Sequence, residues 1–102
     1  MIQIPSQFQL GPRTWDVLIV DQMPDTESDE DCFGLCDPVH AVIYLLSGLP
    51  PAFLRTVWWH EFFHALKFTM GLDDHDEAEV DAVGQLLAQF DKSRNGKAVL
   101  FS

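Results

Sequence analysis

Two histidines four residues apart, His60 and His64, restrict the fold of this chain more than any other feature of the sequence. On an α-helix, residues i and i+4 lie on one face with their Cβ atoms about 6 Å apart. Two imidazoles at that spacing can converge on one divalent cation, at roughly 2.0–2.1 Å each. The spacing therefore predicts a helix through residues 60–64 with a metal site on one of its faces.

Glu61 directly follows the first histidine, about 100° further round the helix. From that position its carboxylate can reach a water molecule on the metal without binding the metal itself. The pattern His-Glu-x-x-His on a helix is typical of zinc sites in which the glutamate is the general base. We predict Zn²⁺ as the cofactor, His60 and His64 as two of its ligands, and Glu61 as the catalytic residue. The alternative is an amphipathic helix that carries two histidines and a glutamate facing solvent.

A catalytic zinc ion takes three protein ligands and keeps one position open for water. Candidates for the third ligand follow His64 in the turn and at the start of a second predicted helix: Asp73, Asp74, His75, Asp76, Glu77, Glu79 and Asp81. A side chain in the first turns of that helix faces the zinc helix more rigidly than one in the turn, which favours Glu77. Asp81, four residues later, is placed to accept a hydrogen bond from the outer nitrogen of a ligand histidine. The alternative is that these acidic residues only stabilise the start of the helix.

Hydrophobic patterning predicts an α+β domain in which a small, mostly antiparallel sheet packs on two main helices. A first short strand is predicted at residues 8–10 and a second, rich in β-branched residues, at 15–20. Segments 33–37 and 39–46 are predicted to form an antiparallel hairpin around Asp37-Pro38. Because segment 39–46 is nearly all apolar, we expect this strand to be central or buried on both faces.

The zinc helix is predicted over residues 51–70, with Gly71 directly after it. A second helix is predicted to begin at Asp73 or Asp74, which can act as its N-cap, and to end at Asn95-Gly96. Its apolar face is predicted from residues at helical spacing: Val83, Leu86, Leu87 and Phe90. We expect residues 98–101 to form a short closing strand.

The length of 102 residues predicts a single domain spanning residues 1–102. The formal net charge of −10 disfavours direct binding to nucleic acid, because such a surface repels phosphate. The longest apolar run, Ala41 to Leu46, is too short to cross a membrane, and the first residues lack the pattern of a signal peptide. We therefore expect a cytoplasmic protein in which Cys32 and Cys36 are reduced and the acidic segment Asp25–Asp31 is a solvated loop.

Followed by Glu77-x-x-x-Asp81, the His60-Glu61-x-x-His64 motif resembles the pattern of the gluzincins. More specifically, residues 15–90 resemble, through these two motifs, the small ImmA/IrrE-type metallopeptidases and the minimal gluzincins of phages and bacteria. The resemblance implies a zincin-like fold and a zinc metallopeptidase that acts on a protein or peptide substrate in the cytoplasm of a bacterial or phage-infected cell. It also implies roles for five residues: zinc ligands His60, His64 and Glu77, general base Glu61, and Asp81 as the carboxylate that orients a ligand histidine.

Two residues depart from the family pattern, since Val80 replaces the usual alanine and Gly84 stands where alanine is common. Glycine in a helix costs about 1 kcal/mol relative to alanine. Gly84 would offset that cost if it permitted a close approach between the two helices.

Two other functions stay open. SprT-like proteases use three histidines, and His75 would then replace Glu77 as the third ligand. The chain could also be a catalytically silent, acidic protein of the same fold that regulates or inhibits a basic partner through Asp25–Asp31. A peptidase further needs a donor for the tetrahedral oxyanion, and Tyr44, His75 and Arg55 are candidates. The sequence does not predict an oligomeric state.

Overall fold

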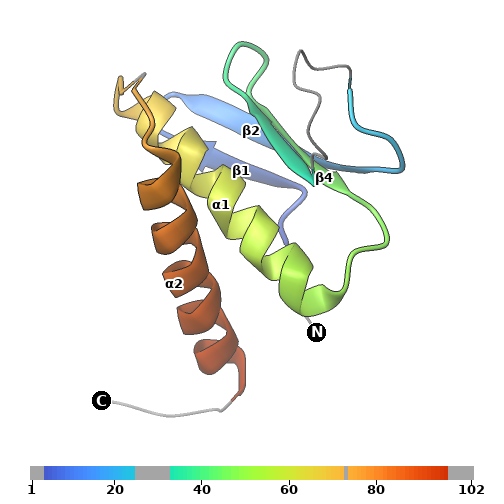
Figure 1. Cartoon of the computed structure of the whole chain (residues 1–102). Coiled ribbons are helices and arrows are strands. Elements are labelled where there is room, and N and C mark those ends of the chain that lie inside the picture. Colours follow the sequence, from blue (N-terminus) through green and yellow to red (C-terminus); the bar gives the residue numbers. More distant parts are fainter. Residues whose placement is uncertain (1–3, 25–32, 73, 97–102) are drawn as a thin grey trace.

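Four strands and two helices form the secondary structure in a computed structural model of the chain (Figure 1). They are β1 (Gln7–Leu10), β2 (Arg13–Val20), β3 (Gly34–Asp37), β4 (Val42–Leu46), α1 (Pro51–Thr69) and α2 (Glu77–Gly96). The structure describes residues 4–24, 33–72 and 74–96. The expected α+β class, the four strands and both helices are confirmed. The expected closing strand at 98–101 and the acidic segment 25–31 lie outside the described residues.

The sheet has the strand order β1-β2-β4-β3. The pairs β1–β2 and β3–β4 are antiparallel, while β2 runs parallel to β4, so the sheet is mixed. The expected hairpin of β3 and β4 is confirmed, with Cys36 opposite Ile43. β4 is central, as its apolar sequence predicts, and β3 forms one edge of the sheet.

The strand predicted over 39–46 begins only at Val42. The Asp37 carboxylate accepts hydrogen bonds from the backbone N–H groups of Val39 and His40, at 3.0 and 3.2 Å. Ala41 has a φ of 55°, in the left-handed region. These two features hold residues 38–41 in a turn and leave a shorter strand.

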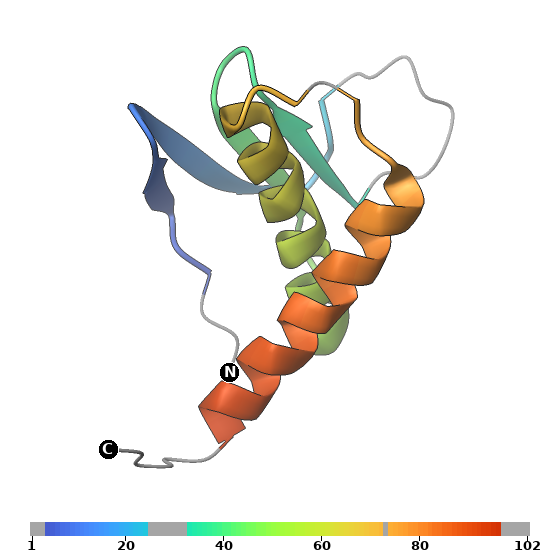
Figure 2. The same ribbon diagram turned by 90° about the vertical axis from the view of Figure 1, so that its left-hand side faces the viewer.

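α1 lies across one face of the sheet, and α2 runs alongside α1 (Figures 1 and 2). Side chains of β2, β4 and α1, with Ala41 from the turn before β4, make up the buried core: Trp15, Val17, Ala41, Ile43, Leu45, Val57, Trp58 and Ala65. On β4, Ile43 and Leu45 are fully buried while Val42, Tyr44 and Leu46 are half-buried. Within the described residues, α1 therefore buries one face of this central strand rather than both. Neither of the two helices is both long enough and apolar enough to span a membrane.

The predicted start of α2 was wrong by several residues, because Asp76 provides the cap in place of Asp73 or Asp74. The Asp76 carboxylate accepts a hydrogen bond from the backbone N–H of Ala78 at 3.0 Å. The helix consequently begins at Glu77. Asp73 itself lies outside the described residues.

The apolar face predicted for α2 is only in part the face that packs on α1, since Val83 and Leu87 are half-buried. Leu86 and Phe90 are each 65% exposed. The buried positions are instead mostly small residues at helical spacing: Val80, Gly84, Ala88 and Asp91. A close helix–helix approach selects small side chains over large ones, which is why the large residues Leu86 and Phe90 do not lie on the buried face.

Truncation of one core isoleucine tests this packing. Ile43→Ala is expected to lower the free energy of unfolding by about 2–5 kcal/mol, because it leaves a cavity under α1. Ile19→Ala removes the same atoms from a side chain that is 57% exposed, and should cost about 1 kcal/mol or less. Urea denaturation of both variants measures the difference. Equal losses would contradict the described core.

Candidate metal centre

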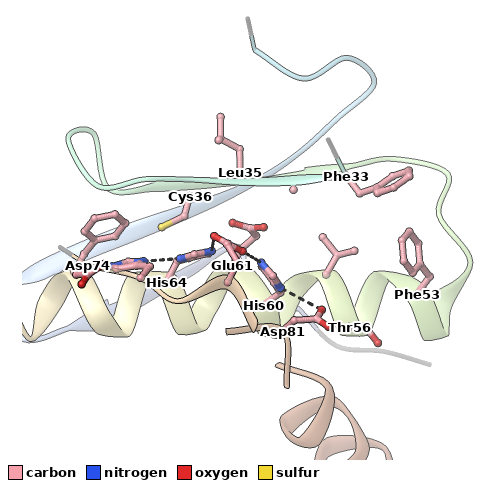
Figure 3. A pocket seen from close by; sticks show the side chains of 15 residues that line it. Phe33, Leu35, Cys36, Phe53, Thr56, His60, Glu61, His64, Asp74 and Asp81 are labelled. Atoms are coloured by element: carbon pink, nitrogen blue, oxygen red, sulfur yellow. Dashed lines mark hydrogen bonds and ion pairs between the residues drawn. The ribbon is translucent and has the colours of Figure 1, made fainter. Parts of the chain in front are cut away.

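Side chains from α1 and α2 converge at one point beside β3 (Figure 3). His60, His64 and Glu77 each offer one ligand atom within 4.8 Å of the others. His60 Nε2 lies 3.4 Å from Glu77 Oε2, and His64 Nε2 lies 3.2 Å from Glu77 Oε1. Donor atoms at the corners of a tetrahedron around zinc are about 3.4 Å apart, given metal–ligand bonds of roughly 2.1 Å. The three side chains thus fit a single divalent metal ion.

α1 places the two histidines as the sequence predicts, one helical turn apart on one face. Their ring centroids are 5.1 Å apart, and their side chains are 22% and 13% exposed. Burial lowers the pKa of His64, and the neighbouring His60, His75 and Lys67 act in the same direction against the charge of Glu77. The neutral imidazole that results is the form that binds a metal.

Glu61 is buried, with 8% of its surface exposed, so it does not face solvent as the amphipathic-helix alternative requires. Its side chain lies against β3 at Gly34. A Cβ on Gly34 would stand 2.9 Å from Glu61 Cγ and 2.6 Å from Val57 Cγ1. Glycine at this position therefore makes room for the carboxylate. Burial, and then the negative charge of Glu77, raise the pKa of Glu61 to about 8.

The outer nitrogens of the two histidines face different partners. His60 Nδ1 lies 3.7 Å from Asp81 Oδ1, which matches the predicted placement but exceeds hydrogen-bond length. Asp81 instead accepts a hydrogen bond from Gln85 at 3.0 Å. His64 Nδ1 lies 2.6 Å from His75 Nδ1, and His75 Nε2 lies 2.7 Å from the carbonyl oxygen of Leu72. His75 thus contacts the outer nitrogen of His64 and is not one of the three residues of the cluster.

The other acidic candidates for the third ligand have other positions. Asp74 lines the cavity beside the cluster without joining it. Asp76 caps α2, and Glu79 accepts a hydrogen bond from the buried Lys67 at 2.6 Å. Asp73 lies outside the described residues. Among the candidates that the structure describes, Glu77 is the one that joins the histidines.

Two of the three oxyanion candidates do not line the cavity. Tyr44 alternates along β4 with Ile43 and Leu45, which face the core, so its side chain points to the opposite face of the sheet. Arg55 Nε lies 3.7 Å from Asp91 in the interface between the helices. His75 lines the cavity, but both of its ring nitrogens already have partners.

Three contacts fasten α2 to α1 and bring Glu77 to the histidines. Gly84 packs on the backbone of His60, where an added Cβ would stand 3.0 Å from the His60 Cα. Lys67 bonds to Glu79 near the start of α2, and Trp59 Nε1 donates to the buried Asp91 at 3.3 Å near its end. The close helix approach that Gly84 suggested in the sequence is confirmed.

The cluster lies in an open cavity of about 1040 Å³ between β3 and the two helices. Cys36 points from β3 toward the helix, whereas Leu35 points away from it (Figure 3). Burial and the nearby Glu61 raise the pKa of the Cys36 thiol, so it stays protonated at neutral pH. The aromatic rings of Phe33 and Phe53 also line the cavity and contact each other edge to face, with centroids 5.0 Å apart.

Comparison of this chain with protein-family models, with curated proteins and with solved structures found no match. The residues of this cluster and their geometry are the observations that bear on function. The spacing of the cluster residues predicted their helices, whereas no pattern in the sequence indicated that His75 would lie against the outer nitrogen of His64.

The raised pKa of Glu61 predicts a pH dependence of stability in the metal-free protein. The carboxyl has a folded pKa of about 8 against an ordinary value of 4.5. Between these values the folded state holds a proton that the unfolded state releases. The free energy of unfolding should therefore fall as the pH rises through this range, by up to about 1.4 kcal/mol per pH unit.

Glu61→Gln should remove this contribution. The test is urea denaturation of both proteins with a chelator present, because the difference between their curves cancels the groups that they share. Parallel curves for wild type and variant across this pH range would contradict the burial of a titrating Glu61.

Gly84→Ala tests the close contact between the helices. Alanine alone would favour the helix by about 1 kcal/mol. We nevertheless expect a net loss of about 1–3 kcal/mol, because the new methyl group meets backbone atoms of His60 that cannot move aside. Gln89→Ala on the exposed side of α2 is the control and should change stability by about 0.5 kcal/mol or less. Thermal unfolding measures both, and a Gly84→Ala protein as stable as wild type would contradict the described interface.

Proposed function

We propose that this chain is a zinc-dependent metallopeptidase of the minimal gluzincin, ImmA/IrrE-like type, with a zincin-like fold. One observation carries the proposal: two imidazole nitrogens and a carboxylate converge at metal-ligand spacing, next to a buried Glu61 in an open cavity. The set of two histidines and one glutamate is that of catalytic zinc sites, which keep a fourth position for water. The proposal includes a protein or peptide substrate in the cytoplasm of a bacterial or phage-infected cell.

His60, His64 and Glu77 would hold the zinc ion in this proposal. When bound, zinc polarises a peptide carbonyl and makes water reactive near neutral pH. Glu61 accepts the proton of the attacking water and then donates it to the leaving amine nitrogen. The positive charge of a bound metal would lower the pKa of this carboxyl from its raised value, and Glu61 would then be available in its basic form.

β3 is the strand that would hold the substrate. It is the edge strand beside β4, and residues of β3 line the same cavity as the histidines. An extended peptide can add to such an edge as a further strand, with its backbone paired to the protein. The rings of Phe33 and Phe53 offer an apolar surface to a substrate side chain on this path.

Glu61→Gln tests the role of the general base. Wild type is expected to bind one zinc ion per chain and to cleave peptides in a quenched-fluorescent library. The variant should keep its zinc and lose turnover by about 100-fold or more, because amide cannot accept the proton. Asp16→Asn, the same carboxylate-to-amide change at an exposed position of β2 away from the cluster, is the matched control and should keep turnover.

Each negative result of this experiment has a distinct meaning. Unchanged turnover in zinc-loaded Glu61→Gln protein would contradict the role of Glu61. A wild-type protein that takes up no zinc would contradict the whole proposal. One zinc ion per chain without cleavage of any peptide would favour the alternative of a silent regulatory or inhibitor protein.

The SprT-like alternative has three histidine ligands, with His75 in place of Glu77. The geometry favours Glu77, because its two carboxylate oxygens face His60 and His64 while His75 contacts the outer nitrogen of His64. Zinc content separates the two. If Glu77 is the ligand, Glu77→Ala loses zinc and His75→Ala retains it; the reverse result would establish the three-histidine site.

A further inference from the structure

We propose that His75 is a positioning residue, which accepts a hydrogen bond from the outer nitrogen of His64 and so fixes the ring and the tautomer with which His64 meets zinc. This inference rests on the proposed function. His75 would not touch the metal or the substrate. Its action would pass through His64.

The direction of each hydrogen bond follows from the carbonyl oxygen of Leu72. That oxygen can only accept, so His75 Nε2, at 2.7 Å, carries the hydrogen and donates. A neutral imidazole with its hydrogen on Nε2 accepts at Nδ1. His75 Nδ1 therefore accepts from His64 Nδ1, which lies 2.6 Å away.

These two hydrogen bonds also determine that the inner nitrogen of His64, Nε2, carries no hydrogen. With its hydrogen on Nδ1, the ring has a free electron pair on Nε2. This is the nitrogen that lies 3.2 Å from Glu77 Oε1 in the cluster. The hydrogen bond to His75 thus selects the tautomer that a metal requires.

The surroundings hold His75 in this place. Its ring lies edge to edge with that of His64, with centroids 4.9 Å apart and planes inclined by only 14°, so the hydrogen bond lies close to the plane of both rings. The centroid of His75 lies 4.3 Å from that of Phe68. Leu72, which supplies the carbonyl, is itself tied to the end of α1, because its N–H donates to the carbonyl of Lys67 at 2.9 Å. The acceptor is therefore anchored on the same helix that carries His64.

His60 provides a contrast within the cluster. The nearest carboxylate oxygen to its outer nitrogen, from Asp81, lies 3.7 Å away. His64 differs, because its outer nitrogen Nδ1 is hydrogen-bonded to His75 within the residues that the structure describes. His75 is consequently the residue to test for orientation of a ligand.

Two substitutions at His75 distinguish the effect of losing the hydrogen-bond acceptor from the effect of losing the aromatic ring. His75→Phe keeps an aromatic ring beside Phe68 but has no acceptor. His75→Asn has an amide oxygen at about the position of Nδ1 and can accept in its place. Zinc affinity is measured for both at one neutral pH by competition with a chelating indicator, and circular dichroism checks that both fold.

We expect His75→Phe to bind zinc about 10–100-fold more weakly than wild type, which is the usual effect of losing such a partner. It should still take up one zinc ion per chain at saturation. His75→Asn should bind within a few-fold of wild type. In nitrogen-15 spectra, the hydrogen on His64 Nδ1 should be present in wild type and in His75→Asn, and absent or exchanging in His75→Phe.

Four results would overturn the inference. The first is wild-type affinity in His75→Phe, and the second is an affinity in folded His75→Asn as low as in His75→Phe. The third is complete loss of zinc from His75→Phe while Glu77→Ala retains it, since His75 would then be a ligand. The fourth is a zinc-free wild-type protein without a hydrogen on His64 Nδ1. Failure of the wild type to bind zinc at all would instead overturn the proposed function, and the zinc-free spectrum would still decide the hydrogen bond.

Discussion

The close contact between α2 and α1 at Gly84 is the constraint on which the candidate metal centre depends. Without a side chain at this position, the backbone of α2 rests on that of His60. The contact between Lys67 and Glu79 and that between Trp59 and Asp91 fix the helices on either side of it. Glu77, at the first turn of α2, is thereby brought to the two histidines of α1. The ligands come from two elements, so the centre exists only while this interface holds.

Electrostatics around the cluster favour a cation. Glu61 is buried, and Glu77 is close enough to raise its pKa further. Two carboxyl groups near one point destabilise each other when both are charged, and a metal ion between them and the imidazoles removes that cost. The space for Glu61 depends in turn on Gly34 in β3. The edge strand and the metal-binding helix are therefore adapted to each other.

Short sequence patterns predicted the features that neighbouring residues determine, such as the faces and the ends of α1. The spacing of His60 and His64 fixed their common face, and Pro51 and Gly71 fixed the ends of α1. Such patterns did not predict features that depend on tertiary contacts, such as the buried face of α2. α2 buries its small residues because it packs on a helix at short distance, and the sequence pattern of large apolar residues pointed to the exposed Leu86 and Phe90 instead.

Other features depend on pairings that a single sequence does not specify. The parallel alignment of β2 with β4 pairs two strands that β3 separates in the sequence. The position of His75 behind His64 depends on the turn after α1, where Leu72 bonds back to the helix end. As a histidine, His75 was a candidate zinc ligand or oxyanion donor. The path of the backbone places it instead against Nδ1 of His64.

The most direct test is a crystal structure of the zinc-soaked protein, with anomalous diffraction measured on both sides of the zinc absorption edge. The account predicts one strong anomalous peak, bonded to His60 Nε2, His64 Nε2 and a Glu77 oxygen. Glu61 would lie beside the peak without binding it. A peak bonded to His75 or Cys36 in place of Glu77, or no peak between α1 and α2, would contradict it.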